Sequence, residues 1–168
     1  MMLRGSCHCR AVRFALFSHT PYPYMLCYCS ICRKTAGGGG YAINIMGDAA
    51  TLEIEGEAEI SVYRARLGEA GEGGEAEGEG ALSSGRRHFC RHCGSALWVS
   101  DPGWPELVHP FASVIDTALP KPPERVEIML DYAAPWAEPS GAADDRRFAE
   151  YPDQSIEDWH RARGLYED

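Results

Sequence analysis

The sequence predicts a mostly β domain that is stabilised by zinc and carries one short helix near its C-terminal end. Three observations support this fold class. Apolar residues alternate with polar residues in several short segments, seven cysteines occur in short motifs, and a helical segment with a capping residue follows position 154. Alternation of this kind is typical of strands, and clustered cysteines can hold the metal that a small fold needs.

Segments with strand periodicity run along most of the chain. Apolar side chains at every second position lie on one face of a strand, and glycine or proline clusters interrupt the pattern. The predicted strand segments are 12–16, 41–45, 52–54, 60–62, 97–99 and 126–130, with a turn at Gly56 and proline-rich breaks at 102–110 and 120–123. Short strands joined by such turns indicate an all-β domain.

The one predicted helix lies between Ser155 and Gly164. Ser155 can cap it, with Asp158 as the reciprocal partner three residues later. Ile156 and Trp159 would face the body of the domain, and Gly164 suits the helix end. The tryptophans are interpreted as core or lining residues: Trp98, Trp104, Trp136 and Trp159.

A length of 168 residues favours a single domain spanning 1–168. Within it, residues 68–85 form a run rich in glycine and glutamate with almost nothing to bury. Such a run cannot offset its ordering entropy, so we predict a flexible loop there. The loop is interpreted either as a surface insertion or as a mobile acidic lid that alters substrate choice.

Composition and charge restrict the partners. A net charge of −9 disfavours binding to nucleic acid, and the best basic patch consists of three arginines, Arg86, Arg87 and Arg91. We see no segment long enough to cross a bilayer and no apolar run before Cys7, so we expect no membrane association and a cytoplasmic location. Clustered cysteines in a reducing compartment bind metal more often than they form disulfides.

All seven cysteines lie in short motifs. They form a C-x-C at Cys7 and Cys9, a C-x-C-x-x-C at Cys27, Cys29 and Cys32, and a C-x-x-C at Cys90 and Cys93. In an extended strand, residues two apart share a face, so a C-x-C would direct two sulfurs to one side and the intervening His8 away from them. A C-x-x-C in a tight turn brings two sulfurs to one ion, and Gly94 suits a turn that needs positive φ. His92 lies inside that turn and is not expected to be a ligand.

The number of cysteines restricts how they can be divided. If no motif is split, the only set of four joins Cys7 and Cys9 with Cys90 and Cys93, and the trio of Cys27, Cys29 and Cys32 remains. Four cysteines make a closed structural zinc site that joins segments about eighty positions apart. Three ligands leave a position open, which is the pattern of a catalytic zinc. We therefore predict two zinc ions per chain.

Three alternatives to two zinc ions stay open from the residues alone. A disulfide framework conflicts with the odd number of cysteines and the expected compartment. An iron–sulfur cluster also uses four cysteines, although the familiar ferredoxin spacings are absent. A single zinc with three idle buried thiols is the third.

The cysteine motifs and their flanks resemble one known family. The segments Gly5–Cys9 (GSCHC), Cys27–Lys34 (CYCSICRK) and Phe89–Ser95 (FCRHCGS) are similar to the glutathione-dependent formaldehyde-activating enzyme family, which shares a domain with centromere protein V. Residues 155–165 are similar to the tail of many bacterial members. The resemblance implies an Mss4-like fold and the same division of the cysteines into a structural site and a catalytic trio. It also implies a carbon–sulfur lyase activity, the addition of glutathione to formaldehyde.

The chemistry of a three-thiolate zinc agrees with that implication. Its fourth position favours a soft ligand such as the glutathione sulfur, and zinc would keep that sulfur ionised at neutral pH. Arg33 and Lys34 are either a contact for a glutathione carboxylate or two exposed cations. The glycines 37–40 either let a peptide-like ligand approach the backbone or simply connect two elements.

Two functions therefore compete. The first is a zinc enzyme whose partners are a small thiol, with glutathione as co-substrate, and formaldehyde or a related aldehyde. The alternative is a non-catalytic zinc-binding module that binds a protein or a small ligand, since fold alone does not determine function. The open trio favours the enzyme, whereas no general base is recognisable in the sequence.

Overall fold

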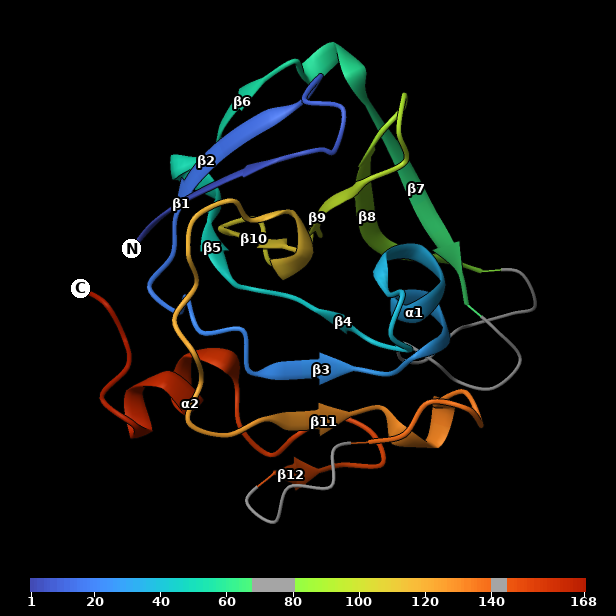
Figure 1. Cartoon of the computed structure of the whole chain (residues 1–168), viewed down its shortest axis with the longest axis vertical. Coiled ribbons are helices and arrows are strands. Elements are labelled where there is room, and N and C mark those ends of the chain that lie inside the picture. The colour runs from blue at the N-terminus through green and yellow to red at the C-terminus, as the bar shows by residue number, and fades with distance from the viewer. Residues whose placement is uncertain (68–80, 140–144) are drawn as a thin grey trace.

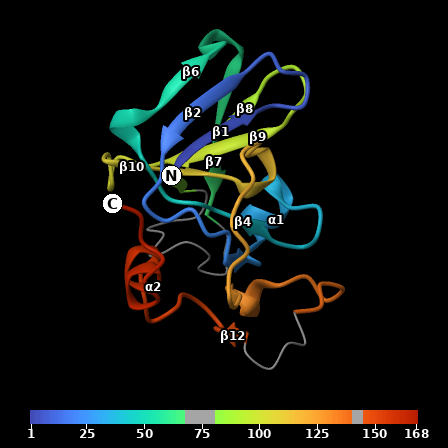
Figure 2. The same ribbon diagram turned by 60° about the vertical axis from the view of Figure 1, so that its left-hand side comes forward.

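The computed structural model describes residues 1–67, 81–139 and 145–168, and in these ranges the chain is mostly β with a short helix near its C-terminal end. The strands form three sheets that Figures 1 and 2 show from two directions. The fold class predicted from the sequence is therefore confirmed, and the cysteine clusters described below are compatible with stabilisation by zinc.

The first sheet is antiparallel and has the order β1-β2-β6. Its strands are β1 (Met2–Ser6), β2 (Arg13–Phe17) and β6 (Glu53–Glu55). Buried and less buried residues alternate along β1 and β2, as expected for a sheet with one face in the core.

The second sheet is also antiparallel and has the order β5-β10-β9-β8-β7. Its strands are β5 (Gly47–Asp48), β10 (Leu107–Pro110), β9 (Ala96–Ser100), β8 (Leu82–Cys90) and β7 (Ile60–Arg66). β10 lies inside the segment 102–110, which we predicted to be a proline-rich break. That prediction is wrong for residues 107–110, which form a strand. Pro110 is compatible with the strand because it is the terminal residue.

The third sheet has the order β12-β11-β3-β4 and is parallel except for the pair of β3 and β4. Its strands are β12 (Arg146–Arg147), β11 (Val126–Ile128), β3 (Met25–Cys27) and β4 (Ala42–Ile43). β4 is shorter than the predicted segment 41–45, and β11 gives way after Ile128 to Met129, whose φ is 61°, and to a 3-10 helix at Leu130–Tyr132.

Two α-helices complete the described part of the chain, with further 3-10 turns at Ala49–Thr51, Glu57–Glu59 and Ala112–Val114. α2 (Ile156–Ala162) confirms the predicted helix: Ser155 caps it by accepting a hydrogen bond from the backbone of Asp158, and Trp159 is buried. α1 (Ser30–Ala36) was not predicted, because its seven residues begin inside a cysteine motif that we interpreted as a tight turn.

The buried side chains form two hydrophobic clusters. The first lies between the first two sheets and includes Leu3, Phe14 and Leu97 together with Cys7 and Cys90. The second surrounds β3 and α2 and includes Phe111, Trp159 and all three cysteines of the trio, Cys27, Cys29 and Cys32. Burial of each large apolar side chain contributes about 1.5–3 kcal/mol, so each cluster is a substantial core. Each cysteine cluster thus belongs to a different core.

Two further expectations need correction. Residues 68–80 of the predicted 68–85 loop lie outside the described residues, but Leu82 to Gly85 belong to β8, where Arg66 pairs with Leu82. Trp136 is 64% exposed and is not a core residue, although it packs over Gly40, whose φ is 89°. Gly56 has a φ of 79° and confirms the predicted turn.

Candidate metal centres and the cavity beside them

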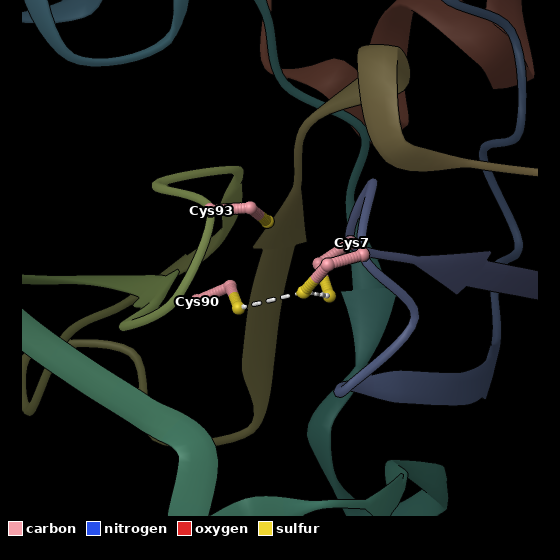
Figure 3. Close-up of side chains that lie close together, drawn as sticks. Cys7, Cys90 and Cys93 are labelled. Atoms are coloured by element: carbon pink, nitrogen blue, oxygen red, sulfur yellow. Dashed lines mark hydrogen bonds between the residues drawn. The ribbon is translucent and has the colours of Figure 1, made fainter.

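The first cysteine cluster joins two distant segments of the chain. Cys7 and Cys9 follow β1, Cys90 ends β8, and Cys93 lies in the turn after it. The ligand atoms of these four residues all lie within 4.8 Å of one another. Figure 3 shows the sulfurs of Cys90 and Cys93 directed from one strand end toward Cys7 on the opposite segment.

The spacing of these sulfurs suits a tetrahedral metal ion. Cys7 Sγ lies 3.5 Å from Cys9 Sγ, and Cys9 Sγ lies 3.7 Å from Cys90 Sγ. A tetrahedron with zinc–sulfur bonds of about 2.3 Å separates its sulfurs by roughly 3.8 Å. The four cysteines can therefore hold a metal ion, and they are only half buried, because Cys7 and Cys90 are inaccessible whereas Cys9 and Cys93 are exposed.

A tight turn presents Cys90 and Cys93. The backbone N–H of Gly94 donates to Cys90 O at 2.9 Å, and the N–H of Cys90 donates to Ser95 O at 2.9 Å. Gly94 has a φ of 73°, which confirms the positive φ predicted for it. The Ser95 hydroxyl lies 3.2 Å from Cys93 Sγ and lowers the pKa of that thiol to about 5.

The C-x-C motifs are presented differently from our expectation. Neither motif lies wholly in a strand: Cys7 and Cys9 occupy the turn between β1 and β2, and in the second motif Cys27 ends β3 whereas Cys29 caps α1. In the first turn, Cys7 Sγ accepts a hydrogen bond of 3.3 Å from the N–H of Val12, and Arg10 adopts a φ of 62°. The turn therefore brings the two sulfurs together, and strand alternation does not.

The second cluster is compact in sequence and buried. Cys27 ends β3, Cys29 is the N-cap of α1, and Cys32 lies in the first turn of that helix. The N–H of Cys32 donates to Cys29 Sγ at 3.3 Å, so one thiol both caps the helix and faces its neighbours. The three ligand atoms lie within 4.8 Å of one another, and no residue is more than 7% exposed. Within the described residues, this group has three members.

An arginine from another sheet contacts the trio. Arg87 on β8 approaches Cys32 with its Nη2, 3.9 Å from Cys32 Sγ. Hydrogen bonds from the Cys27 and Cys29 thiols, and then the guanidinium of Arg87, hold the pKa of Cys32 well below its usual range. Hydrogen bonds with Cys29 and Cys32 raise the pKa of Cys27.

A cavity of about 500 Å³ opens on the trio. This size is within the range that binds small molecules. Besides the three cysteines, its lining includes polar and aromatic residues that the sequence analysis did not assign to a site, namely Asn44, Ser83, Ser84, Arg87, Asp101, Trp104, His109 and Tyr151. Burial lowers the pKa of His109 to about 4, so its imidazole is neutral at physiological pH.

Strand geometry explains why the sequence did not reveal these residues. Arg87, Val99 and His109 are cross-strand partners on β8, β9 and β10, so only the sheet register brings them together. Side chains alternate between the two faces of β8, so Arg86 and Arg87 point to opposite sides of the sheet. Arg86 accordingly lines a different cavity of about 590 Å³, which has no cysteine in its lining. The three arginines that we grouped as a basic patch are thus divided, and Arg91 instead donates to Ala58 O.

Other residues singled out in the sequence lie away from the cavity. Arg33 and Lys34 fall in the last turn of α1 and do not line it, and neither do glycines 37–40. His8 and His92 are not part of either cysteine group, as expected, and the His92 ring pairs with Glu59.

Within the described residues, no helix has the length and apolar character needed to cross a membrane. A family model described as glutathione-dependent formaldehyde-activating enzyme matches residues 2–130, a range that contains all seven cysteines. A solved structure of a Rhodobacter sphaeroides protein is 22% identical, covers 70% of this chain and 91% of its own, and has a TM-score of 0.47.

A protein of Halomonas elongata, named provisionally as a glutathione-dependent formaldehyde-activating enzyme, is 56% identical over 167 residues and covers 99% of each chain. This identity extends past the family model into α2 and the C-terminal segment. With both cysteine groups assembled and the match covering nearly the whole sequence, the chain belongs to the glutathione-dependent formaldehyde-activating enzyme family.

Proposed function

We propose that this protein is a zinc-dependent carbon–sulfur lyase that adds glutathione, or a similar small thiol, to formaldehyde or a related aldehyde. The observation that carries the proposal is the trio of Cys27, Cys29 and Cys32, buried at the wall of a 500 Å³ cavity. Three sulfurs leave one position of a tetrahedral ion for a ligand from the cavity. The family membership supports the same chemistry.

Zinc held by the trio would lower the pKa of a thiol bound in the open position and so supply a thiolate at neutral pH. The residues of the chain would do the rest. The cavity wall orients the thiol toward the aldehyde carbon and limits access of water. The Arg87 guanidinium offsets the negative charge that three thiolates concentrate beside it.

The reaction itself needs little more than orientation. The thiol sulfur forms a bond to the carbonyl carbon, the C=O π pair moves to the oxygen, and that oxygen takes a proton from solvent while the thiol proton is released. Net addition of one thiol to one aldehyde gives a hydroxymethyl thioether. The reverse reaction breaks the carbon–sulfur bond, and it is this direction that defines a lyase.

We assign the other cluster, Cys7, Cys9, Cys90 and Cys93, to a structural zinc. Four cysteines close the coordination sphere, and no cavity described above is lined by them. The metal would clamp the turn after β1 to the turn after β8, which lie 81 positions apart at Cys9 and Cys90. On this proposal the chain carries two zinc ions, acts on small molecules in the cytoplasm, and needs neither nucleic acid nor a membrane.

The test must separate catalysis from the uncatalysed addition, which is fast. We would measure exchange between formaldehyde, glutathione and the hydroxymethyl product by NMR at equilibrium, with and without protein. Zinc-replete protein should accelerate the exchange, and the Cys29→Ser variant should return it to the background rate with one zinc per chain. Equal exchange rates with and without the wild-type protein would reject the enzyme and favour a zinc-dependent binding module.

A further inference from the structure

Two polar atoms in the cavity beside the trio are buried and have no hydrogen-bond partner among the described residues. They are Arg87 Nη1 and Asn44 Oδ1, and both residues line the cavity on which the trio opens. A buried polar group without a partner costs about 1–3 kcal/mol, so a protein rarely keeps two of them in one cavity without a use. One of these atoms is a donor and the other is an acceptor.

The two atoms reach the cavity from different sheets. Arg87 comes from β8 in the second sheet and contacts Cys32 through its other terminal nitrogen, 3.9 Å from the sulfur. Asn44 follows β4 in the third sheet, where Ala42 pairs with Cys27. Since residues two apart share a face of a strand, Asn44 lies on the same face as Ala42 and its partner Cys27, two residues further along. The donor and the acceptor therefore flank the trio.

A group that satisfies both atoms must itself accept one hydrogen bond and donate another. A carboxylate cannot do so, because it only accepts, and it would leave Asn44 Oδ1 unpaired. An ammonium only donates and would leave Arg87 Nη1 unpaired. A hydroxyl group does both.

We propose that Arg87 and Asn44 bind the oxygen that originates from the aldehyde, an assignment that rests on the proposed function. In the aldehyde, that oxygen accepts a hydrogen bond from Arg87 Nη1. As the carbon–sulfur bond forms, the oxygen gains negative charge, and a hydrogen bond from a guanidinium strengthens. After the oxygen takes a proton from solvent, the new hydroxyl donates to Asn44 Oδ1, and the site is complementary to the product.

This arrangement also gives the two nitrogens of one guanidinium separate tasks. Nη2 faces the Cys32 sulfur, and Nη1 faces the substrate oxygen. A lysine would keep the charge but not the fork of two fixed donors, so the Arg87→Lys variant should not replace the arginine.

The experiment measures binding without turnover, so it is read separately from the rate assay above. Calorimetry on zinc-replete protein compares two stable thioethers, S-(2-hydroxyethyl)glutathione and S-ethylglutathione, which differ by the hydroxyl group. The wild-type protein should bind the hydroxyl compound about tenfold more tightly, as expected for one hydrogen bond to a charged group. The Arg87→Met and Asn44→Leu variants should each reduce that ratio toward one.

Arg86→Met is the matched control, because Arg86 neighbours Arg87 on β8 but lines the other cavity. It should keep the tenfold ratio, and the zinc content of every variant should equal that of the wild type. If Arg87→Met weakens both thioethers equally, then Arg87 binds a carboxylate of glutathione and the proposal is wrong. A wild-type ratio near one would overturn it as well. If Arg87→Met does not fold, the affinity ratio of the two thioethers is measured for Asn44→Leu and Arg87→Lys instead, and an unchanged ratio in both would reject the proposal.

If the wild-type protein accelerates exchange but shows no preference for the hydroxyl compound, only the proposed role of Arg87 and Asn44 is rejected. If the wild-type protein prefers the hydroxyl compound but does not accelerate exchange, only the lyase function is rejected.

Discussion

The two cysteine clusters use the same ligand atom and differ in almost everything else. Cys7, Cys9, Cys90 and Cys93 join turns that are distant in sequence, and two of the four are exposed. Cys27, Cys29 and Cys32 lie within one strand end and one helix start, are all buried, and face a cavity. A cluster that is partly exposed can still be structural, and a buried one can still be the reactive site.

The sequence separation of the cysteines in each cluster indicates on which cluster the fold depends. A metal at the four-cysteine cluster would close a long loop between two sheet ends, so its binding free energy would also be folding free energy. The trio lies within six consecutive residues, Cys27 to Cys32, whose backbone is already held by β3 and α1. Four predictions test this comparison.

The largest effect should come from removing a ligand of the four-cysteine cluster. Cys90 is fully buried, and we expect Cys90→Ser to lose that metal and to be largely unfolded. Structural zinc contributes about 10–16 kcal/mol in small zinc domains, which is comparable with the whole stability of a protein. Thermal unfolding and metal content would be measured beside Cys32→Ser, which should stay folded. Equal midpoints for the two variants would contradict the assignment.

Limited chelation should separate the clusters without mutation. On the proposed assignment the trio would hold its zinc with three protein ligands and the other cluster with four, so a competing chelator should remove the first zinc from the trio. The protein should then hold one zinc per chain, keep its far-UV circular dichroism and its unfolding midpoint, and lose its exchange activity. Unfolding that accompanies the first zinc released would show that the order is reversed.

A smaller effect should appear as the pH falls. An unfolded chain protonates a histidine near pH 6.5, whereas burial lowers the pKa of His109 in the fold to about 4. Between these pH values the histidine is protonated in the unfolded state and neutral in the folded state, so the free energy of unfolding falls as the pH drops from 6.5 toward 4. The loss should be on the order of 1–3 kcal/mol.

His109→Gln should flatten that dependence in urea unfolding curves recorded between pH 7 and pH 5. Parallel curves for the wild type and His109→Gln would mean that His109 is not buried as described, and the wall of the cavity would need revision.

The smallest effect should come from the cap of α2, which packs on the core that contains the trio. Ser155→Ala removes the hydroxyl that accepts from the backbone of Asp158 and should cost about 1 kcal/mol. Ser155→Asp, which can still cap, should cost little. Both variants should keep two zinc ions, and a lost zinc would mean that α2 supports the trio more directly.

Much of the site was predictable from spacing. The cysteine motifs, their division into a group of four and a group of three, and the turn at Gly94 follow from residue type and local geometry, and the structure brings the same groups together. The capped helix at Ser155 was also predictable, because capping depends on residues three positions apart. Interactions of this kind are local in sequence.

The strand interpretation of the C-x-C motifs was wrong for a related reason. Alternation places two sulfurs on one face, but a turn does the same, and only the hydrogen bonds of residues 7–12 distinguish them. Similarly, α1 is too short for its periodicity to stand out, and it begins at a cysteine that acts as both cap and candidate ligand.

The sequence by itself determined the mostly β class, the two cysteine groups and the metal chemistry that they allow. Only the tertiary structure decided which cluster is buried, that Arg87 contacts Cys32, and that Asn44 and His109 share its cavity. The contact of Arg87 with Cys32 joins β8 to α1, and the position of Arg87 beside His109 depends on the register of β8, β9 and β10. A shift of one residue would direct Arg86 instead of Arg87 toward the trio, because side chains alternate along a strand.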